Sequence, residues 1–363
     1  MTARHLIAPP DPSLHDDRRQ LVADLRSDTV THPTQAMYER MRTAPLGDDG
    51  LDGDPTAREL EALVADKLGK QAGLYVPTAT MGNLLAVLSQ AERQAQVVLE
   101  STSHMFTTER GVATLSGLFY LGIPGVAGAM DLDALEQALL PSGSLQTALV
   151  CMETTHANAG GAILPLAHMQ AVHDLARSRH ACVHLDGARL FNAAVALNVS
   201  ADEVTRSADT VSLCLSKGLS APAGAVLAGP QATIDRARRL RKMLGGTQRQ
   251  IGVLAAAGIE AVQTMPHRLV QDHVHARRLS QALNSIHPEL LHADMPTTNI
   301  VMLDLPATGH DSSVWTHELG KAGVLVRAWG ARRLRFVTHR HIDATRVDAA
   351  IAAFRKTADK LLA

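Results

Sequence analysis

The chain carries no excess charge of either sign. Its 363 residues include 35 Lys and Arg against 36 Asp and Glu, and 20% of the residues are charged. A balanced charge creates no net field that would attract nucleic acid or an anionic membrane surface. We therefore expect neither partner, and chemistry on a small molecule is the default expectation.

Long hydrophobic runs are missing as well. Although 46% of the chain is apolar, no stretch approaches the about 18 uninterrupted apolar residues of a membrane span. Residues 1–20 contain Pro, Asp and Arg but lack the apolar centre of a secretory signal. We expect no membrane association, and we treat residues 1–20 as an N-terminal extension.

Cysteine is scarce, and two common binding motifs are absent. Each of the three cysteines, Cys151, Cys182 and Cys214, lies in an apolar strand-like run, which indicates reduced, buried thiols and a cytoplasmic protein. The loop 47–54 lacks the twelve-residue spacing and final Glu of an EF-hand, and we expect no metal site. No G-x-G-x-x-G turn follows a predicted strand in the first half, which argues against a nicotinamide-dependent dehydrogenase.

Strand and helix patterns alternate along the chain as far as Gly229. This alternation predicts an α/β fold with a large, doubly wound, mostly parallel sheet. After Pro266 the predicted strands are fewer and more widely spaced, which indicates a small α+β domain. We predict an extension at 1–20, a large domain at 21–265 whose first segment packs on the small domain, and a small C-terminal domain at 266–363.

The stretch from His180 to Gly224 contains two apolar runs that end in reactive residues. The first run ends at Asp186 and Arg189, and the second ends at Ser216 and Lys217. Ligands in open α/β sheets bind beyond the carboxyl ends of such strands, so we expect Asp186 and Lys217 to share a pocket. A partly desolvated Lys can react with an aldehyde, and a nearby Asp can keep a pyridine nitrogen protonated. The pair suggests pyridoxal phosphate (PLP), although a lone Lys after a strand is more often a surface residue.

Three further positions can each be interpreted in two ways. The residues Thr78–Asn83 open a helix, where backbone N–H groups suit a phosphate, but an ordinary Thr cap fits equally well. His104 lies in a predicted loop, where histidines are more often exposed than catalytic. Arg335 lies within an apolar strand, and such an Arg needs an anionic partner, for which a ligand carboxylate is suitable.

The ordered set of these segments resembles the threonine aldolase family, within the aspartate-aminotransferase-like, fold type I PLP enzymes. The resemblance spans Asp24 to His339. Its motifs are D-L-R-S-D-T-V-T at 24–31, G-D-D at 47–49, D-P-T at 54–56, T-M-G-N at 80–83, His104, E-T-T-H at 153–156, H-L-D-G-A-R at 184–189, L-S-K-G-L-S-A-P at 215–222, Lys242 with G-G at 245–246, R-Q at 249–250 and R-F-V-T-H at 335–339.

The resemblance implies a role for each matching residue. Lys217 would carry PLP covalently, Asp186 would contact the pyridine nitrogen, and His104 would stack on the ring. The other cofactor-binding residues would be Ala79 and Thr80 at the phosphate, with Arg189, Ser216 and an Arg249 from an adjacent subunit. The substrate carboxylate would be bound by Ser27, Arg189 and Arg335, with Lys242 close by, and His156 with His104 would lie near the β-hydroxyl.

The implied activity is cleavage of an L-β-hydroxy-α-amino acid, such as threonine, allo-threonine or phenylserine, to glycine and an aldehyde. β-Elimination or transamination on the same fold is the alternative, and a scaffold without activity is a further one. The resemblance also implies a homotetramer, a dimer of dimers with shared sites. Two departures stand out: Ala79 replaces the usual Gly, and Leu51 replaces a common Tyr, which favours bulkier β-substituents.

Overall fold

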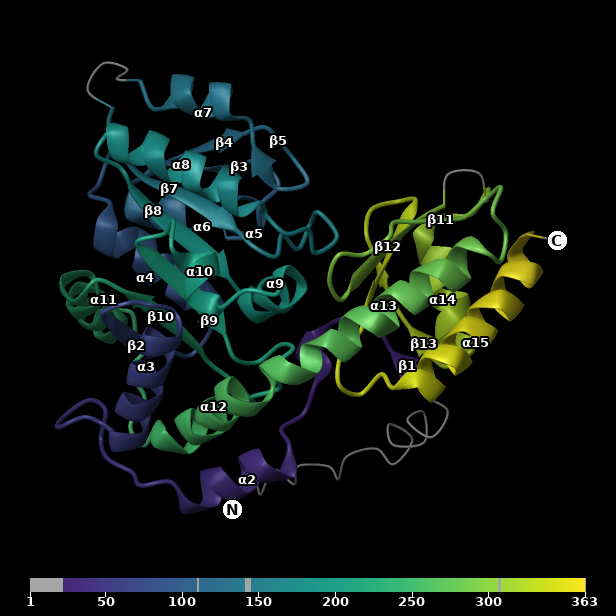
Figure 1. The fold of residues 1–363 in the computed structure, drawn as a ribbon, viewed down its shortest axis with the longest axis horizontal. Helices are drawn as coiled ribbons and strands as arrows, with labels where there is room; N and C mark the ends of the chain where they lie inside the picture. Colours follow the sequence, from purple (N-terminus) through teal and green to yellow (C-terminus); the bar gives the residue numbers. More distant parts are fainter. Residues whose placement is uncertain (1–21, 110, 141–144, 306–307, 363) are drawn as a thin grey trace, which may run out of the picture.

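The computed structural model describes residues 22–109, 111–140, 145–305 and 308–362. Figure 1 shows two lobes side by side, with the C-terminal elements, drawn in yellow, in the smaller lobe. No helix in these described ranges is long and apolar enough to cross a membrane. The extension predicted at residues 1–20 lies outside the described residues.

The larger lobe contains a seven-stranded sheet in the order β2-β10-β9-β8-β7-β3-β4. The strands from β9 to β4 run parallel, whereas β10 runs antiparallel to both β9 and β2. The predicted mostly parallel sheet is confirmed, but the parallel alternation does not continue to Gly229. Only a short loop joins β9 to β10, and a parallel neighbour requires a crossover of about a dozen residues or more. The strands are β2 (Ala72–Val76), β3 (Gln96–Glu100), β4 (Phe119–Ile123), β7 (Thr147–Glu153), β8 (Cys182–Gly187), β9 (Thr210–Cys214) and β10 (Ala225–Gly229).

Successive residues of the central strands are buried on opposite faces of the sheet. Val98 and Val150 belong to one apolar cluster, while Val97 and Leu149 belong to another. Burial on both faces explains why these strands read as continuous apolar runs in the sequence. The surrounding helices are α3 (Pro55–Lys67), α4 (Ala79–Gln90), α7 (Leu132–Ala138), α8 (Leu166–Ser178), α9 (Leu190–Leu197), α10 (Ala201–Thr205), α11 (Gln231–Met243) and α12 (Gly252–Thr264).

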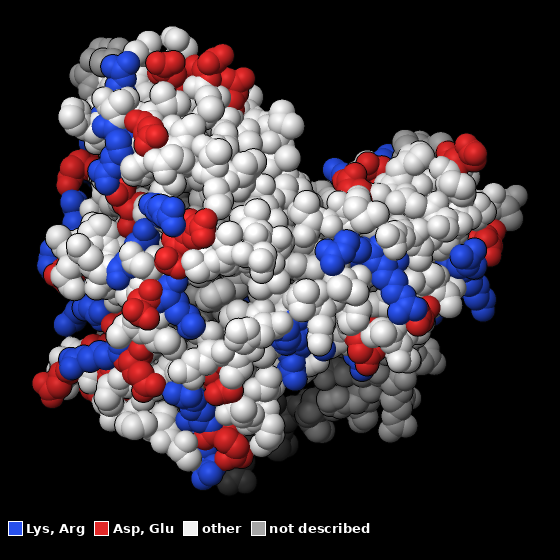
Figure 2. All heavy atoms as spheres, in the orientation of Figure 1, with Lys and Arg blue, Asp and Glu red and all other residues white. Residues whose placement is uncertain are grey.

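Two helices show how the local sequence sets the fold. Asp54 caps α3 by accepting a hydrogen bond from Ala57 N–H, with Pro55 at the first helical position, as the sequence predicts. The basic helix α11 is paired with carboxylates, through Arg236 to Glu92, Arg238 to Glu61 and Arg241 to Asp49. On the face drawn in Figure 2, blue and red side chains are interspersed.

The three cysteines form no disulfide; Cys151 and Cys214 are buried and Cys182 is half-buried.

Short elements connect the sheet to the rest of the larger lobe. The short elements are η2 (Asp28–Val30), α2 (Gln35–Thr43), α5 (His104–Thr107), α6 (Gly111–Ser116), β5 (Gly125–Val126), β6 (Ala129–Met130) and η3 (Pro266–Arg268).

The smaller lobe is an antiparallel sheet covered by helices. Its sheet has the order β11-β12-β15-β14, and the N-terminal strand β1 pairs in parallel with β13. Ala23 and Leu25 belong to the apolar core of this lobe, so the first described segment packs on the C-terminal elements. These elements are β1 (Ala23–Asp24), α13 (Leu269–Asn284), β11 (His292–Ala293), β12 (Ile300–Asp304), α14 (Ser312–Lys321), β13 (Val324–Leu325), β14 (Arg327–Ala328), β15 (Arg333–Val337) and α15 (Ala344–Leu362).

We expect Phe354→Ala to destabilise the smaller lobe by about 3–5 kcal/mol, because it leaves a cavity in an aromatic core. The Phe354 ring stacks on Trp315 at 5.4 Å between centroids and meets Phe336 edge-on at 6.1 Å. Urea unfolding followed by tryptophan fluorescence measures the loss. The control is Val314→Ala on α14, where the side chain is exposed; equal losses for the two variants would contradict the packing argument.

Candidate functional site

Three parallel strands end side by side and place polar residues at one edge of the sheet. Glu153 on β7 is the register partner of Asp186 on β8, and Asp186 is the register partner of Ser212 on β9. Lys217 follows β9 after two residues, and its side chain is partly exposed. Asp186 and Lys217 therefore follow the same sheet edge on neighbouring strands.

A chain of buried hydrogen bonds holds Asp186. Its carboxylate accepts from Asn83 Nδ2 at 3.0 Å and from Ala188 N at 3.0 Å. Because the Asn83 amide donates through nitrogen, its oxygen accepts from His184 Nε2 at 3.1 Å. The other His184 nitrogen, Nδ1, accepts from Thr210 Oγ1 at 2.9 Å. Burial lowers the pKa of His184 to about 4, which keeps the ring neutral and suits this arrangement.

His104 begins α5 and presents one free ring nitrogen. Its backbone N–H donates to Glu153 Oε2 at 2.6 Å, and its Nδ1 meets Glu109 Oε1 at 3.0 Å. The hydrogen bond to Glu109 raises the pKa of His104 against the opposing effect of burial, and the charges of Glu109, Asp186 and Glu153 act in the same direction as that bond. The side chain is 38% exposed, and Nε2 has no partner among the described residues.

His156 is placed differently from His104. The side chain is completely buried, with Nε2 at 3.1 Å from Glu100 Oε2 and at 3.9 Å from Glu153 Oε2. Its Nδ1 accepts a hydrogen bond from Ala159 N at 3.2 Å. Both ring nitrogens of His156 are thus engaged, whereas Nε2 of His104 has no partner among the described residues.

The start of α4 provides unpaired donors. Thr78 caps the helix through a bond from Met81 N, while the N–H groups of Ala79 and Thr80 have no acceptor among the described residues. Free N–H groups and the positive end of a twelve-residue helix suit a phosphate. The Thr80 hydroxyl itself lies 3.0 Å from Glu109 and donates to it, so the backbone offers the donors. The geometry of this segment is compatible with both interpretations, an ordinary Thr cap and an anion-binding site.

Arg189 does not project freely toward a ligand. Its Nε and Nη2 donate to the two Asp28 oxygens at 2.7 and 2.6 Å, and both side chains are almost fully buried. Burial alone would raise the pKa of Asp28, but the charge and hydrogen bonds of Arg189, with a smaller effect from Lys217, lower it to about 2. Any bond from Arg189 to a substrate carboxylate would have to be added to this pair.

Arg335 lies beside that pair without an anion of its own. The residue is 4% exposed, and its Nε has no hydrogen-bond partner among the residues that the structure describes. Burial, with the charges of Arg189 and Arg327, lowers the pKa of Arg335 to about 10. Its guanidinium lies 4.3 Å from the Trp329 ring centroid. Two buried guanidinium groups thus face one carboxylate, which leaves a surplus positive charge suited to an anion.

The remaining predicted residues fall into two groups. Ser27 caps η2 by accepting from Thr29 N at 3.2 Å, and Ser216 lies near Cys214, with Oγ at 3.6 Å from Sγ. Arg249 and Lys242, by contrast, are exposed; Arg249 is 3.6 Å from Asp48. A surface pocket of about 400 Å³ includes Lys242 in its lining. The structure brings neither exposed residue into contact with Lys217 within the described part of the chain.

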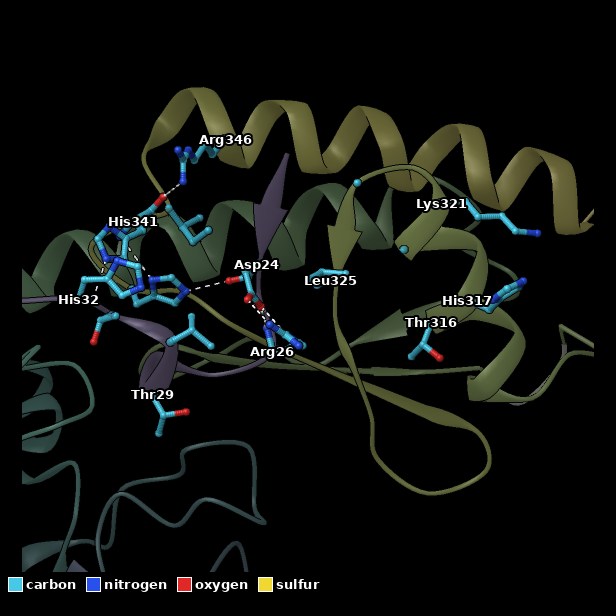
Figure 3. A pocket seen from close by; sticks show the side chains of 16 residues that line it. Asp24, Arg26, Thr29, His32, Thr316, His317, Lys321, Leu325, His341 and Arg346 are labelled. Carbon is cyan, nitrogen blue, oxygen red and sulfur yellow. Dashed lines mark hydrogen bonds and ion pairs between the residues drawn. The ribbon is translucent and has the colours of Figure 1, made fainter. Parts of the chain in front are cut away.

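A pocket of about 1290 Å³ is lined on one side by the N-terminal segment and on the other by the smaller lobe. Figure 3 shows His32 and His341 at one end and His317 and Lys321 at the other. His341 Nε2 accepts from His32 N at 3.0 Å, and the residues proposed from the sequence do not line this pocket. His339 Nε2 also lies 2.8 Å from Asp24 O, so His339 and His341 link the N-terminal segment to the smaller lobe. No group of three or more His, Cys, Asp or Glu side chains in the described ranges has the arrangement of a metal site.

Several residues of this site received no role from the sequence. They include Asp28, Asn83, Glu109 and Trp329, together with Glu100, Glu153 and His184. Asp28 and Asn83 lie inside the motifs that match the family, which is the signal that could have identified them. Glu109 follows His104 by five residues, but only the folded chain shows that the two side chains meet.

Comparison with known proteins shows clear relatives. A family model described as beta-eliminating lyase matches residues 24–308. The chain is 40% identical over 345 residues to low-specificity L-threonine aldolase 1 of Arabidopsis thaliana, covering 92% of this chain and 95% of that protein. It is 37% identical over 335 residues to the low specificity L-threonine aldolase of Escherichia coli strain K12, covering 91% and 97%. The structure is similar to that of Leishmania major threonine aldolase, with a TM-score of 0.78 and 17% identity over 94% of this chain and 99% of that one.

We expect Asp28→Asn to lower the free energy of unfolding by about 3–5 kcal/mol at pH 7, because it leaves Arg189 as an unpaired buried charge. The folded-state pKa of Asp28, about 2, lies below its ordinary value of 3.8. The wild-type pair therefore stabilises the fold above pH 4 and loses its effect as the pH falls toward 2.

Urea unfolding at several pH values tests this expectation. The difference between wild type and variant should be largest near neutrality and shrink below pH 4. Asp174→Asn is the control, since Asp174 lies on the surface, and it should change stability little. An Asp28→Asn protein as stable as the wild type at pH 7 would contradict the role of the pair.

Proposed function

The chain belongs to the beta-eliminating lyase family, in its threonine aldolase group, and from that membership we propose that it cleaves L-β-hydroxy-α-amino acids to glycine and an aldehyde. The support for the proposal is the sheet edge that Asp186 on β8 shares with Lys217, two residues after β9. His104 lies close enough to Asp186 for the charge of that carboxylate to act on its ring. The fold is that of the fold type I PLP enzymes, and the cofactor of the family is PLP.

The residues present fit this cofactor. The free N–H groups of Ala79 and Thr80 suit its phosphate, and Asp186, fixed by Asn83, suits a protonated pyridine nitrogen. Lys217 would bind its aldehyde, and Ser216 would lie nearby. When bound, PLP supplies an electron sink for the electrons of a bond broken at the substrate Cα.

The protein's own residues then account for substrate binding and proton transfer. The surplus positive charge at Arg335, beside Arg189, would bind the substrate carboxylate together with Ser27. His104 would accept the proton of the β-hydroxyl at its free Nε2, since the nitrogens of His156 are occupied. Removal of that proton lets the oxygen form a carbonyl as the Cα–Cβ bond breaks. We assign His156 to the support of this region.

We further propose a homotetramer, built as a dimer of dimers with shared active sites. The support is the exposure of Arg249 and Lys242 close to apolar side chains that face solvent in the single chain, Leu51 at 78% and Met243 at 80%. A second copy would bury these groups and would bring Arg249 to its neighbour's phosphate site. The three free cysteines support a cytoplasmic location.

The purified protein with added PLP should release glycine and an aldehyde in equal amounts from L-threonine, L-allo-threonine and phenylserine. Because Leu51 provides an apolar side chain where the family commonly has Tyr, turnover of phenylserine should exceed that of threonine. Product analysis by chromatography distinguishes this outcome from the alternatives. Release of pyruvate or another 2-keto acid with ammonia would instead indicate β-elimination, and pyridoxamine phosphate would indicate transamination.

Two inactive variants should restore activity when combined, if the sites are shared. Lys217→Ala removes the covalent attachment, and Arg249→Ala removes the contribution to the neighbour's site. Refolding an equal mixture should return about a quarter of wild-type activity, because half the dimers then contain one intact site of two. Mixtures of each variant with itself are the controls. Activity of the mixture no higher than that of the separate variants would contradict sharing.

A further inference from the structure

Glu109 occupies a central place among the proposed site residues. The residue is 7% exposed. Its Oε1 lies 3.0 Å from His104 Nδ1 and 3.0 Å from Thr80 Oγ1. Its Oε2 lies 3.3 Å from Asn83 Nδ2, the same amide that donates to Asp186. One carboxylate thus contacts His104, the start of α4 and the amide that holds Asp186.

The hydrogen bonds around Glu109 determine which His104 nitrogen carries the proton. An ionised carboxylate can only accept hydrogen bonds. The proton between His104 and Glu109 must therefore lie on Nδ1, and the neutral ring keeps its lone pair on Nε2. Nε2 has no partner within the described ranges, and the His104 side chain is 38% exposed. A carboxylate that fixes a histidine in this way increases its basicity and orients it.

We propose that Glu109 is the positioning residue of this site, which holds His104 with Nε2 directed to the substrate and its Nδ1 proton directed into the protein. The role rests on the proposed function, since it concerns the proton that leaves the β-hydroxyl. It differs from a purely structural role, because a structural anchor would hold the loop without changing the titration of His104.

Other titratable groups also lie near His104 and Glu109. Glu153 on β7 and Asp186 on β8 act on His104. Tyr120 on β4 and Cys151 on β7 face Glu109, but burial raises the pKa of both side chains and keeps them neutral. Glu153 and Asp186 stay in place when Glu109 alone is changed, so a change in the titration of His104 then reports Glu109.

The test is the variant Glu109→Gln, in which the amide can offer either oxygen or NH₂ to His104 and has no charge. Histidine titration by NMR on cofactor-free protein, with His104→Asn to identify the resonance, should show that the pKa of His104 falls relative to wild type. With PLP and substrate, kcat should fall by about tenfold or more, as for other residues that orient a reacting group. In a plot of kcat/KM against pH, the acidic limb should move to lower pH, because a less basic His104 stays neutral in more acidic solution.

Two further variants complete the test. Glu109→Asp keeps the charge and should retain the raised pKa of His104 with a lower rate. Glu100→Gln, which changes the partner of His156, should leave the His104 titration as in wild type. An unchanged His104 titration and an unmoved acidic limb in Glu109→Gln would overturn the proposal.

The result also separates this inference from the proposed function. If Glu109→Gln does not fold, the wild type still decides, because a His104 pKa at or below the ordinary value of 6.5 would refute the role of Glu109. If the protein cleaves no β-hydroxy amino acid, the proposed function fails, while the titration of the cofactor-free protein still measures the effect of Glu109 on His104.

Discussion

The parallel register of β7, β8 and β9 is the constraint on which the site depends. Parallel strands in register end at one edge of the sheet, so residues distant in sequence become neighbours there. Glu153, Asp186 and Ser212 are register partners across three strands. Because the strands are buried on both faces, their positions are fixed by packing, and the polar groups at their ends are held in place without a flexible support.

The second determinant of the site is a group of buried charges, Asp28, Arg189 and Arg335, at the junction of the two lobes. The N-terminal segment pairs with β13 of the smaller lobe through β1, and a few residues later Asp28 binds Arg189 at the start of α9. Arg335 reaches the same place from β15, and its Nε has no hydrogen-bond partner in the described part of the chain. An amino-acid carboxylate would neutralise the surplus charge. In the proposed function, substrate binding and the contact between the lobes would depend on the same buried groups.

Much of this arrangement could be predicted from the sequence, because its signals are local. The apolar runs before Asp186 and Lys217 predicted two neighbouring strands and their shared edge, and the change of pattern after Pro266 predicted the smaller lobe. The antiparallel β10 was missed because a short apolar run does not reveal its direction. The positions of the domain boundaries and the roles of individual site residues stay predictions.

The side-chain partners could not be predicted, because they depend on long-range contacts. Asn83 and Asp186 are 103 positions apart, and Asp28 and Arg189 are 161 apart. The family resemblance implied that both histidines lie near the β-hydroxyl, yet nothing local to His156 shows that it lies between Glu100 and Glu153 with both nitrogens engaged. Nothing local shows either that Arg189 is already paired. These features arise only when distant strands and loops pack together.

The site of covalent attachment is the most direct measurement. Reduction of the PLP-loaded protein with borohydride makes the link between the cofactor aldehyde and a lysine permanent, and peptide mass spectrometry identifies that lysine. We expect the label on Lys217 alone, with none at Lys242 or the other lysines. A label on a different lysine, or a protein that binds PLP without forming any such link, would contradict the assignment of this sheet edge as the active site.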